Sequence, residues 1–168
     1  LFQIRYEPHG HPQLAKEVIR EIPSVKESAD MGLDHGAWTV LKFMYPEADI
    51  PVFQLSIDYT QPLSRHYELA QSLKKMREKG VLIIGSGNVV HNLGRMDWNN
   101  INATSESWAL EFDATVKSKL EKNDHHALID YKKFGSSALI SVPSEDHYVP
   151  MIYTLGLTDA KEQLTWLY

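Results

Sequence analysis

The stretch that decides the expected fold is residues 81–92, VLIIGSGNVVHN. Its first four residues are apolar and mostly β-branched, which predicts a strand buried on both faces in the middle of an α/β sheet. Two glycines end the strand and let the backbone approach whatever lies beyond its carboxyl end. Asn88, His91 and Asn92 follow, at the sheet edge where α/β folds place ligands. We therefore expect a functional site here, although a glycine turn with an incidental histidine would give the same pattern.

The glycines of this stretch do not form a nucleotide-binding loop. No third glycine falls at the spacing of a dinucleotide fingerprint, and the chain contains no Gly-Lys-Ser/Thr sequence to hold nucleotide phosphates. The expected ligand is therefore not a nucleotide bound through such a loop.

The residues before this stretch complete a strand–helix–strand unit. Residues 50–58 are apolar at nearly every position and predict a second buried strand, and residues 62–79 predict an amphipathic helix that Gly80 ends. Parallel strands joined by a right-handed crossover would bring Asp58 and His91 to the same sheet edge. We expect one α/β domain with a central, mostly parallel or mixed sheet flanked by helices.

The rest of the chain reads mainly as helices. The apolar spacing predicts helices over residues 12–22, 38–44, 105–120 and 127–133, a further helix that starts at Ser144, and a final strand within residues 157–168. Asp34 is expected to cap the second of these helices.

Composition excludes several classes of function. The net charge of −5 and the lack of a Lys/Arg cluster argue against nucleic-acid binding, and no apolar run reaches the roughly 18 residues of a membrane span. There is no signal-peptide pattern, and no cysteine, which excludes disulfides, thiolate ligands and a cysteine nucleophile. We expect a cytoplasmic protein whose eight histidines and carboxylates would supply any transition-metal site.

Two further histidines occur in sequence contexts that suit chemistry. His35 follows Asp34 at an expected helix start, where the helix N-terminus favours a neutral imidazole. His147 follows two acidic residues at another expected helix start. Ordinary helix starts would also account for both patterns.

Taken together, these local signatures resemble one family. GLDHGAW at residues 32–38, PVFQLSID at 51–58, GSGNVVHN at 85–92 and PSEDHYVP at 143–150 occur in the order seen in class III extradiol ring-cleavage dioxygenases. The chain is most similar to the 4,5-DOPA extradiol dioxygenase branch, and the resemblance covers essentially all of it.

The resemblance implies a fold, a reaction and a set of roles. It implies an α/β enzyme that opens the ring of a DOPA-like catechol with O₂ at non-haem Fe(II), with Zn(II) able to occupy the same site. His147 would be the late metal ligand. His91 would be the acid–base residue and would contact the metal in resting forms, and His35 would handle the substrate hydroxyl or oxygen intermediates. Asn88 and Asn92 are the residues expected to bind substrate.

One departure from the family pattern stands out. The two other metal ligands of the family lie in a His-Gly-Ser-Pro turn and a Ser-Ala-His pattern, and neither occurs in this chain. Both ends also read as cut, so we expect residues 1–168 to be a single catalytic-domain fragment that lacks the N-terminal ligand region and binds metal weakly or not at all. A non-catalytic binding or scaffold protein and a zinc-dependent hydrolase remain alternatives, and the catechol and the oligomeric state stay open.

Overall fold

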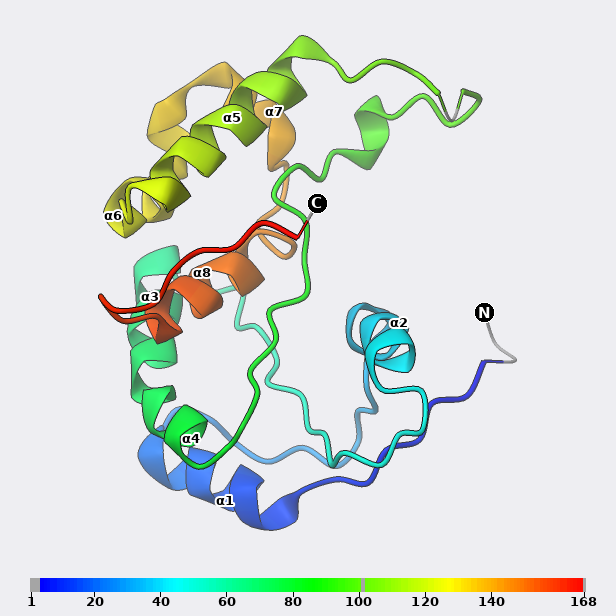
Figure 1. Ribbon diagram of the computed structural model, residues 1–168, viewed down its shortest axis with the longest axis vertical. Helices are drawn as coiled ribbons and strands as arrows, with labels where there is room; N and C mark the ends of the chain where they lie inside the picture. Colours follow the sequence, from blue (N-terminus) through cyan, green and yellow to red (C-terminus); the bar gives the residue numbers. More distant parts are fainter. Residues whose placement is uncertain (1–3, 101, 168) are drawn as a thin grey trace.

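The computed structural model describes residues 4–100 and 102–167, and its regular elements are helices. The α-helices are α1 (Pro12–Glu21), α2 (His35–Met44), α3 (Leu63–Ser72), α4 (Lys74–Glu78), α5 (Ser107–Glu121), α6 (His125–Ile129), α7 (Ser136–Ser141) and α8 (Val149–Leu157), and the 3-10 helices are η1 (Leu93–Arg95) and η2 (Tyr131–Phe134). Figure 1 shows α3 and α8 at the centre, α5 to α7 on one side of them and α1 and α4 on the other, with α2 standing apart.

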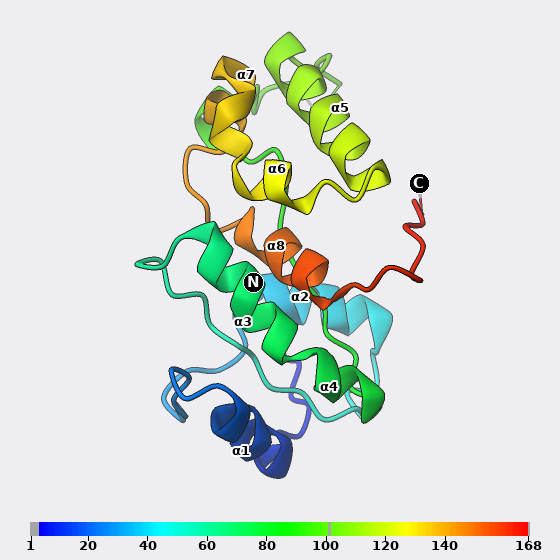
Figure 2. The same ribbon diagram turned by 90° about the vertical axis from the view of Figure 1, so that its left-hand side faces the viewer.

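Two buried apolar clusters hold the helices together. The larger cluster joins α5 to α8, η2 and the start of α3 around Phe112, Tyr131 and Tyr148, none of which is more than 1% exposed. The smaller cluster joins α1, α3 and α4 around Val18 and Met76. Figure 2 shows these two groups stacked above and below the crossing of α3 and α8.

The crossing of α3 and α8 depends on small residues. A Cβ placed on Gly156 of α8 would lie 2.6 Å from the Tyr67 carbonyl oxygen and 2.7 Å from the Ala70 Cβ, both on α3. Glycine and alanine let two helix backbones approach closely, so α8 packs directly on α3.

The expectation of a central sheet is wrong. Within residues 4–100 and 102–167 no segment is a β-strand, and residues 50–58 and 81–88 are extended segments without ladder hydrogen bonds between them. The expected parallel pairing that would align Asp58 with His91 is therefore not formed. Asp58 instead accepts hydrogen bonds from the backbone and hydroxyl of Thr60 in its own turn.

The physical reason is that the apolar runs are buried on one side only. Val81 and Ile83 pack against the cluster of α1, α3 and α4, whereas Leu82 and Ile84 remain 64% and 40% exposed. A continuous apolar run predicts burial on both faces, but a strand also needs a neighbour to satisfy its backbone groups. The described residues supply helices for one side of this segment and no neighbouring strand.

The helix predictions fared better. The helices around Pro12, Trp38, Phe112 and Leu128 are confirmed, as are the Asp34 cap and a left-handed Gly80, whose φ is 81°. The helix expected over residues 62–79 is divided at Leu73 into α3 and α4.

The end of the chain differs from expectation. The helix expected to start at Ser144 starts only at Val149, because residues 143–148 form turns, and α7 was not predicted. Residues 158–167 contain no strand, and Tyr168, also part of the expected final strand, lies outside the described residues. Among the described helices, none has the length and apolar character needed to cross a bilayer.

Candidate functional site

The segment that carries His91 packs on the turn that carries His147. The His91 N–H donates to the Ser141 carbonyl at 2.8 Å, and the Asn88 N–H donates to the His147 carbonyl at 3.0 Å. The two backbones lie very close next to the Asn88 bond, since a Cβ on Gly87 would lie 2.3 Å from the His147 carbonyl oxygen. The glycine-rich stretch therefore brings residues about 55 positions apart side by side.

The imidazole rings of His91 and His147 are stacked. Their centroids lie 3.6 Å apart with an angle of 19° between the ring planes. Both residues are half-buried, and they come from a loop and a turn rather than from helices. The arrangement places two imidazoles side by side on one surface.

His147 is held toward its neutral form. Burial lowers its pKa most, and the neighbouring imidazoles of His91 and His35 lower it further, while the Asp146 carboxylate opposes them. Asp146 lies 3.5 Å from the His147 Nε2 and accepts a hydrogen bond of 2.5 Å from the Ser144 hydroxyl, which lowers the pKa of that carboxyl. A neutral imidazole can accept a proton or bind a metal, whereas a protonated imidazolium can do neither.

His35 is the first residue of α2 and lies exposed at the end of that helix. Asp34 caps the helix by accepting a hydrogen bond from the Ala37 N–H at 2.8 Å. The Ser86 hydroxyl ties the same turn to the histidine-bearing segment by donating to the Gly36 carbonyl at 2.8 Å. His35 is thus attached to the segment that carries His91 and lies close enough to affect the pKa of His147.

The two asparagines lie on the same segment but differ in their partners. The Asn92 side chain donates to the Ile140 carbonyl at 2.6 Å and so ties the segment to α7. Asn88 is exposed, and its backbone N–H is the group that bonds to the His147 loop. Binding of substrate by these residues stays a prediction.

Two surface hollows of the described residues lie elsewhere. One lies between the end of α5 and residues 162–166, and the other between α4, Leu157 and Glu162. Neither contains His35, His91 or His147.

Sequence reasoning missed the side chains that support the histidines. Gln54 hydrogen-bonds to Asp34, Ser86 to Gly36, and Ser144 to Asp146. Gln54 carried a usable signal, because it is a polar residue within an apolar run. The serines carried none, since a serine beside glycine or proline is common in turns.

Comparison with known proteins assigns the chain to a family. Residues 1–167 match the profile of the family described as the catalytic LigB subunit of aromatic ring-opening dioxygenase. The chain belongs to this family.

Individual relatives agree with this membership. The chain is 37% identical to the 4,5-DOPA dioxygenase extradiol of Escherichia coli (strain K12) over 98% of its own length and 62% of that protein, and 35% identical to the protein of the same name from Mirabilis jalapa, over 93% and 59%. The crystal structure of an uncharacterized protein from Escherichia coli K12 superposes with a TM-score of 0.88 at 35% identity, covering 98% of this chain and 69% of that one. The chain spans about three-fifths of the length of these curated relatives.

Members of this family generally use a metal cofactor, but the described residues do not fit a metal by themselves. No group of three or more histidine and carboxylate side chains in residues 4–100 and 102–167 could hold a metal ion. The stacking of His91 and His147 also directs their in-plane lone pairs along nearly parallel planes rather than toward one point. These residues offer at most part of a coordination sphere.

Proposed function

We propose that the protein containing this chain is an extradiol dioxygenase that opens the ring of a catechol such as DOPA with O₂ and uses Fe(II) as its cofactor. Family membership and the names of the relatives support a ring-opening dioxygenase. The observation that carries the proposal within the chain is the stacked pair of His91 and His147, with His35 close enough to influence it. We propose His147 as a metal ligand to be joined by others, and His91 as a residue that contacts the metal only in the resting form, once the two rings separate, with Zn(II) able to bind in place of iron.

The chain's own residues suit the handling of catechol protons. A catechol must lose phenolic protons before its ring can be oxidised, and a neutral imidazole near pH 7 accepts such a proton better than a carboxylate does. We assign this role to His91, which stacks on a ring kept toward its neutral form. His35 is the second proton-handling group, and Asn88 and Asn92 are the polar side chains nearest to His91 in sequence for the substrate hydroxyls.

The test uses the full-length protein loaded with Fe(II) under anaerobic conditions. We expect that O₂ and L-DOPA, or another catechol, give a yellow ring-cleavage product with consumption of one O₂ per catechol. Replacement of His91 by alanine should reduce turnover by about 100-fold or more, as expected for loss of an acid–base group, while the far-UV circular dichroism stays unchanged. Equal losses of turnover and of folding would instead make His91 a structural residue.

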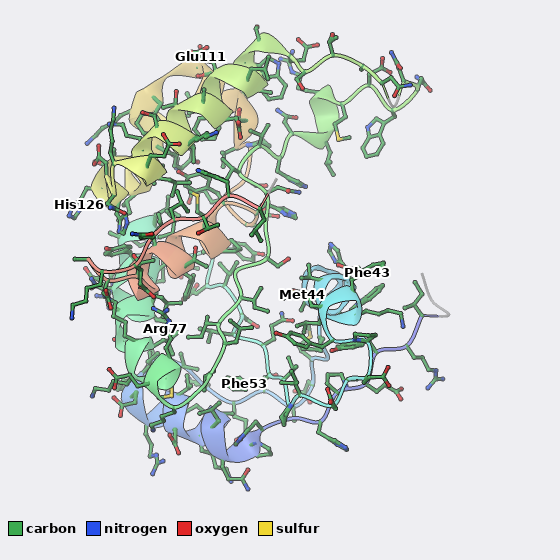
Figure 3. The ribbon with its side chains drawn as sticks, in the orientation of Figure 1. Phe43, Met44, Phe53, Arg77, Glu111 and His126 are labelled. Atoms are coloured by element: carbon green, nitrogen blue, oxygen red, sulfur yellow. The ribbon has the colours of Figure 1, made fainter. Side chains whose placement is uncertain are left out.

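His126→Ala provides a matched control. His126 is an exposed histidine on α6, and Figure 3 shows it on the side of the molecule opposite α2. Its replacement should leave turnover unchanged. Full-length protein that holds no stoichiometric metal and cleaves no catechol would support a scaffold role, whereas turnover without O₂ would support a hydrolase.

A further inference from the structure

A side chain from the extended segment at residues 50–58 makes two hydrogen bonds to the residue that caps α2. The Gln54 Oε1 accepts a hydrogen bond from the Asp34 N–H at 3.0 Å, and the Gln54 Nε2 donates to the Asp34 Oδ2 at 2.9 Å. The amide orientation is fixed, because a backbone N–H can only donate and a carboxylate can only accept. One carboxamide therefore holds both the backbone and the side chain of Asp34.

The same Asp34 carboxylate also caps the helix. The other oxygen of the same carboxylate, Asp34 Oδ1, accepts from the Ala37 N–H at 2.8 Å. On the far side of His35, the Ser86 hydroxyl donates to the Gly36 carbonyl at 2.8 Å. The residues immediately before and after His35 are thus each bonded to a different extended segment.

The other anchors of α2 lie toward its far end, where the Tyr6 hydroxyl donates to the Tyr45 carbonyl at 3.0 Å and Lys42 Nζ to the Arg5 carbonyl at 3.3 Å. Leu41 is the only residue of α2 that is buried, and Phe43 and Met44 at the other end are 88% and 50% exposed. Figure 3 shows α2 separated from the helices that form the two apolar clusters. The hydrogen bonds to Asp34 and Gly36 are therefore the contacts that hold the first turn of α2 itself beside the segment that carries His91.

We infer that Gln54 and Ser86 are positioning residues for His35. This inference rests on the proposed function, in which His35 handles a proton of the substrate. Neither residue needs to touch the substrate; each acts by holding a neighbour of the imidazole. A displacement of about 1 Å in a group that takes part in catalysis can reduce a rate about 100-fold, so bonds that add little to stability can govern turnover.

The variants are Gln54→Met, which keeps the length of the side chain and removes both bonds, and Ser86→Ala. In the full-length iron-loaded enzyme we expect each to lower kcat about 10- to 100-fold and to leave the KM for the catechol within about twofold. Gln13→Met is the matched control, because Gln13 is exposed on α1 and distant in sequence from every residue of this network. A kcat loss in the control equal to that of Gln54→Met would overturn the inference.

A double variant shows whether Gln54 acts through His35. If it does, adding Gln54→Met to His35→Ala lowers kcat no further, because the group being positioned is already gone. If the two losses multiply, Gln54 acts independently of His35 and the inference is wrong. The same comparison is made with Ser86→Ala.

A structural readout separates this inference from the proposed function. If the wild-type protein cleaves no catechol, the proposed function fails. Hydrogen exchange of the Ala37 amide in the same full-length protein still reports on the hydrogen bonds between Gln54 and Asp34. Gln54→Met should speed this exchange about 10-fold or more, since the cap then loses the side chain that orients it, and Gln13→Met should not. Unchanged exchange in Gln54→Met would contradict the inference whatever the activity.

Discussion

Gly87 leaves no room for a side chain at the candidate site. Its backbone passes so close to the turn bearing His147 that an added Cβ would meet a carbonyl oxygen at 2.3 Å and the carbonyl carbon at 3.2 Å. These are backbone atoms, which cannot rotate away as a side chain can. The backbone contact that brings His91 and His147 together thus depends on the absence of a side chain at Gly87.

Gly87→Ala should therefore destabilise the protein by about 1–3 kcal/mol, the usual cost of forcing an extra methyl group into a packed site. It should also separate the rings of His91 and His147. Urea denaturation measures the first effect. Gly94→Ala is the control, because the nearest neighbour of the added Cβ would be the side-chain oxygen of Asn92 at 3.4 Å. The free energy of unfolding of this variant should change little.

At this scale the sequence identified the candidate residues but not the stacking of two of their rings. His35, His91 and His147 could be singled out because each occurs in a distinctive local pattern. The stacking of two of them could not be foreseen, since it depends on how a loop and a turn from distant parts of the chain meet. Their roles remain predictions.

At the scale of elements, α3 is bound to its neighbours through two adjacent residues. His66 Nδ1 lies 3.2 Å from the Tyr153 hydroxyl on α8, and the Tyr67 hydroxyl lies 3.0 Å from the His125 Nδ1 on α6. Burial is the main cause that lowers the pKa of both histidines. Asp58 and Glu145 partly oppose the shift at His66, whereas His126 and Lys74 add to it at His125 and Asp124 opposes it.

These shifts make folding sensitive to acid. Because the folded pKa of each histidine lies below its unfolded value of about 6.5, the unfolded chain takes up more protons as the pH falls through that value. The free energy of unfolding should then decrease below about pH 6.5, by up to about 1.4 kcal/mol per pH unit for each such histidine. Urea denaturation between pH 7.5 and 5 checks this.

His66→Gln should reduce that pH dependence, because glutamine keeps a polar group near Tyr153 but binds no proton. His9→Gln, at an exposed position ahead of α1, should leave it unchanged. If the free energy of unfolding changes with pH equally in wild type and His66→Gln, protonation of groups other than His66 causes the acid sensitivity.

The crossing of α3 and α8 makes a second prediction for these elements. Gly156→Ala would place a methyl group 2.6 Å from the Tyr67 carbonyl, so α8 must shift away from α3. We expect a loss of about 1–3 kcal/mol in the free energy of unfolding. Gly10→Ala, where nothing lies within 4 Å, should cost much less, and similar losses in both variants would contradict the close packing of α8 on α3.

The elements also show where sequence reasoning succeeds. Helices were predictable because an amphipathic period and a capping residue are local properties, as at Pro12 and Asp34. A sheet is not local, since its strands need partners from elsewhere in the chain. The apolar runs around Phe53 and Ile83 suggested strands, and the described residues give each of them a helical cluster on one side only.

At the scale of the whole molecule, apolar side chains range from fully buried to almost fully exposed. Phe112 is fully buried at the centre of the larger cluster, whereas Phe43 on α2 is 88% exposed. Phe112→Ala should cost about 3–5 kcal/mol, as for other large-to-small changes in a core. Phe43→Ala should change the free energy of unfolding by no more than about 0.5 kcal/mol, and comparable losses in the two variants would mean that Phe43 is covered in solution.

The three histidines share a feature of backbone rather than of chemistry: His91 lies in a loop, His147 in a turn and His35 at a helix tip. Single hydrogen bonds to its neighbours hold His35 in place, whereas Val90 and Tyr148, next to His91 and His147, pack in the larger buried cluster. Gentle warming should therefore release His35 from the stacked pair while the helical signal persists. A protein built this way loses its reaction centre first and its shape afterwards.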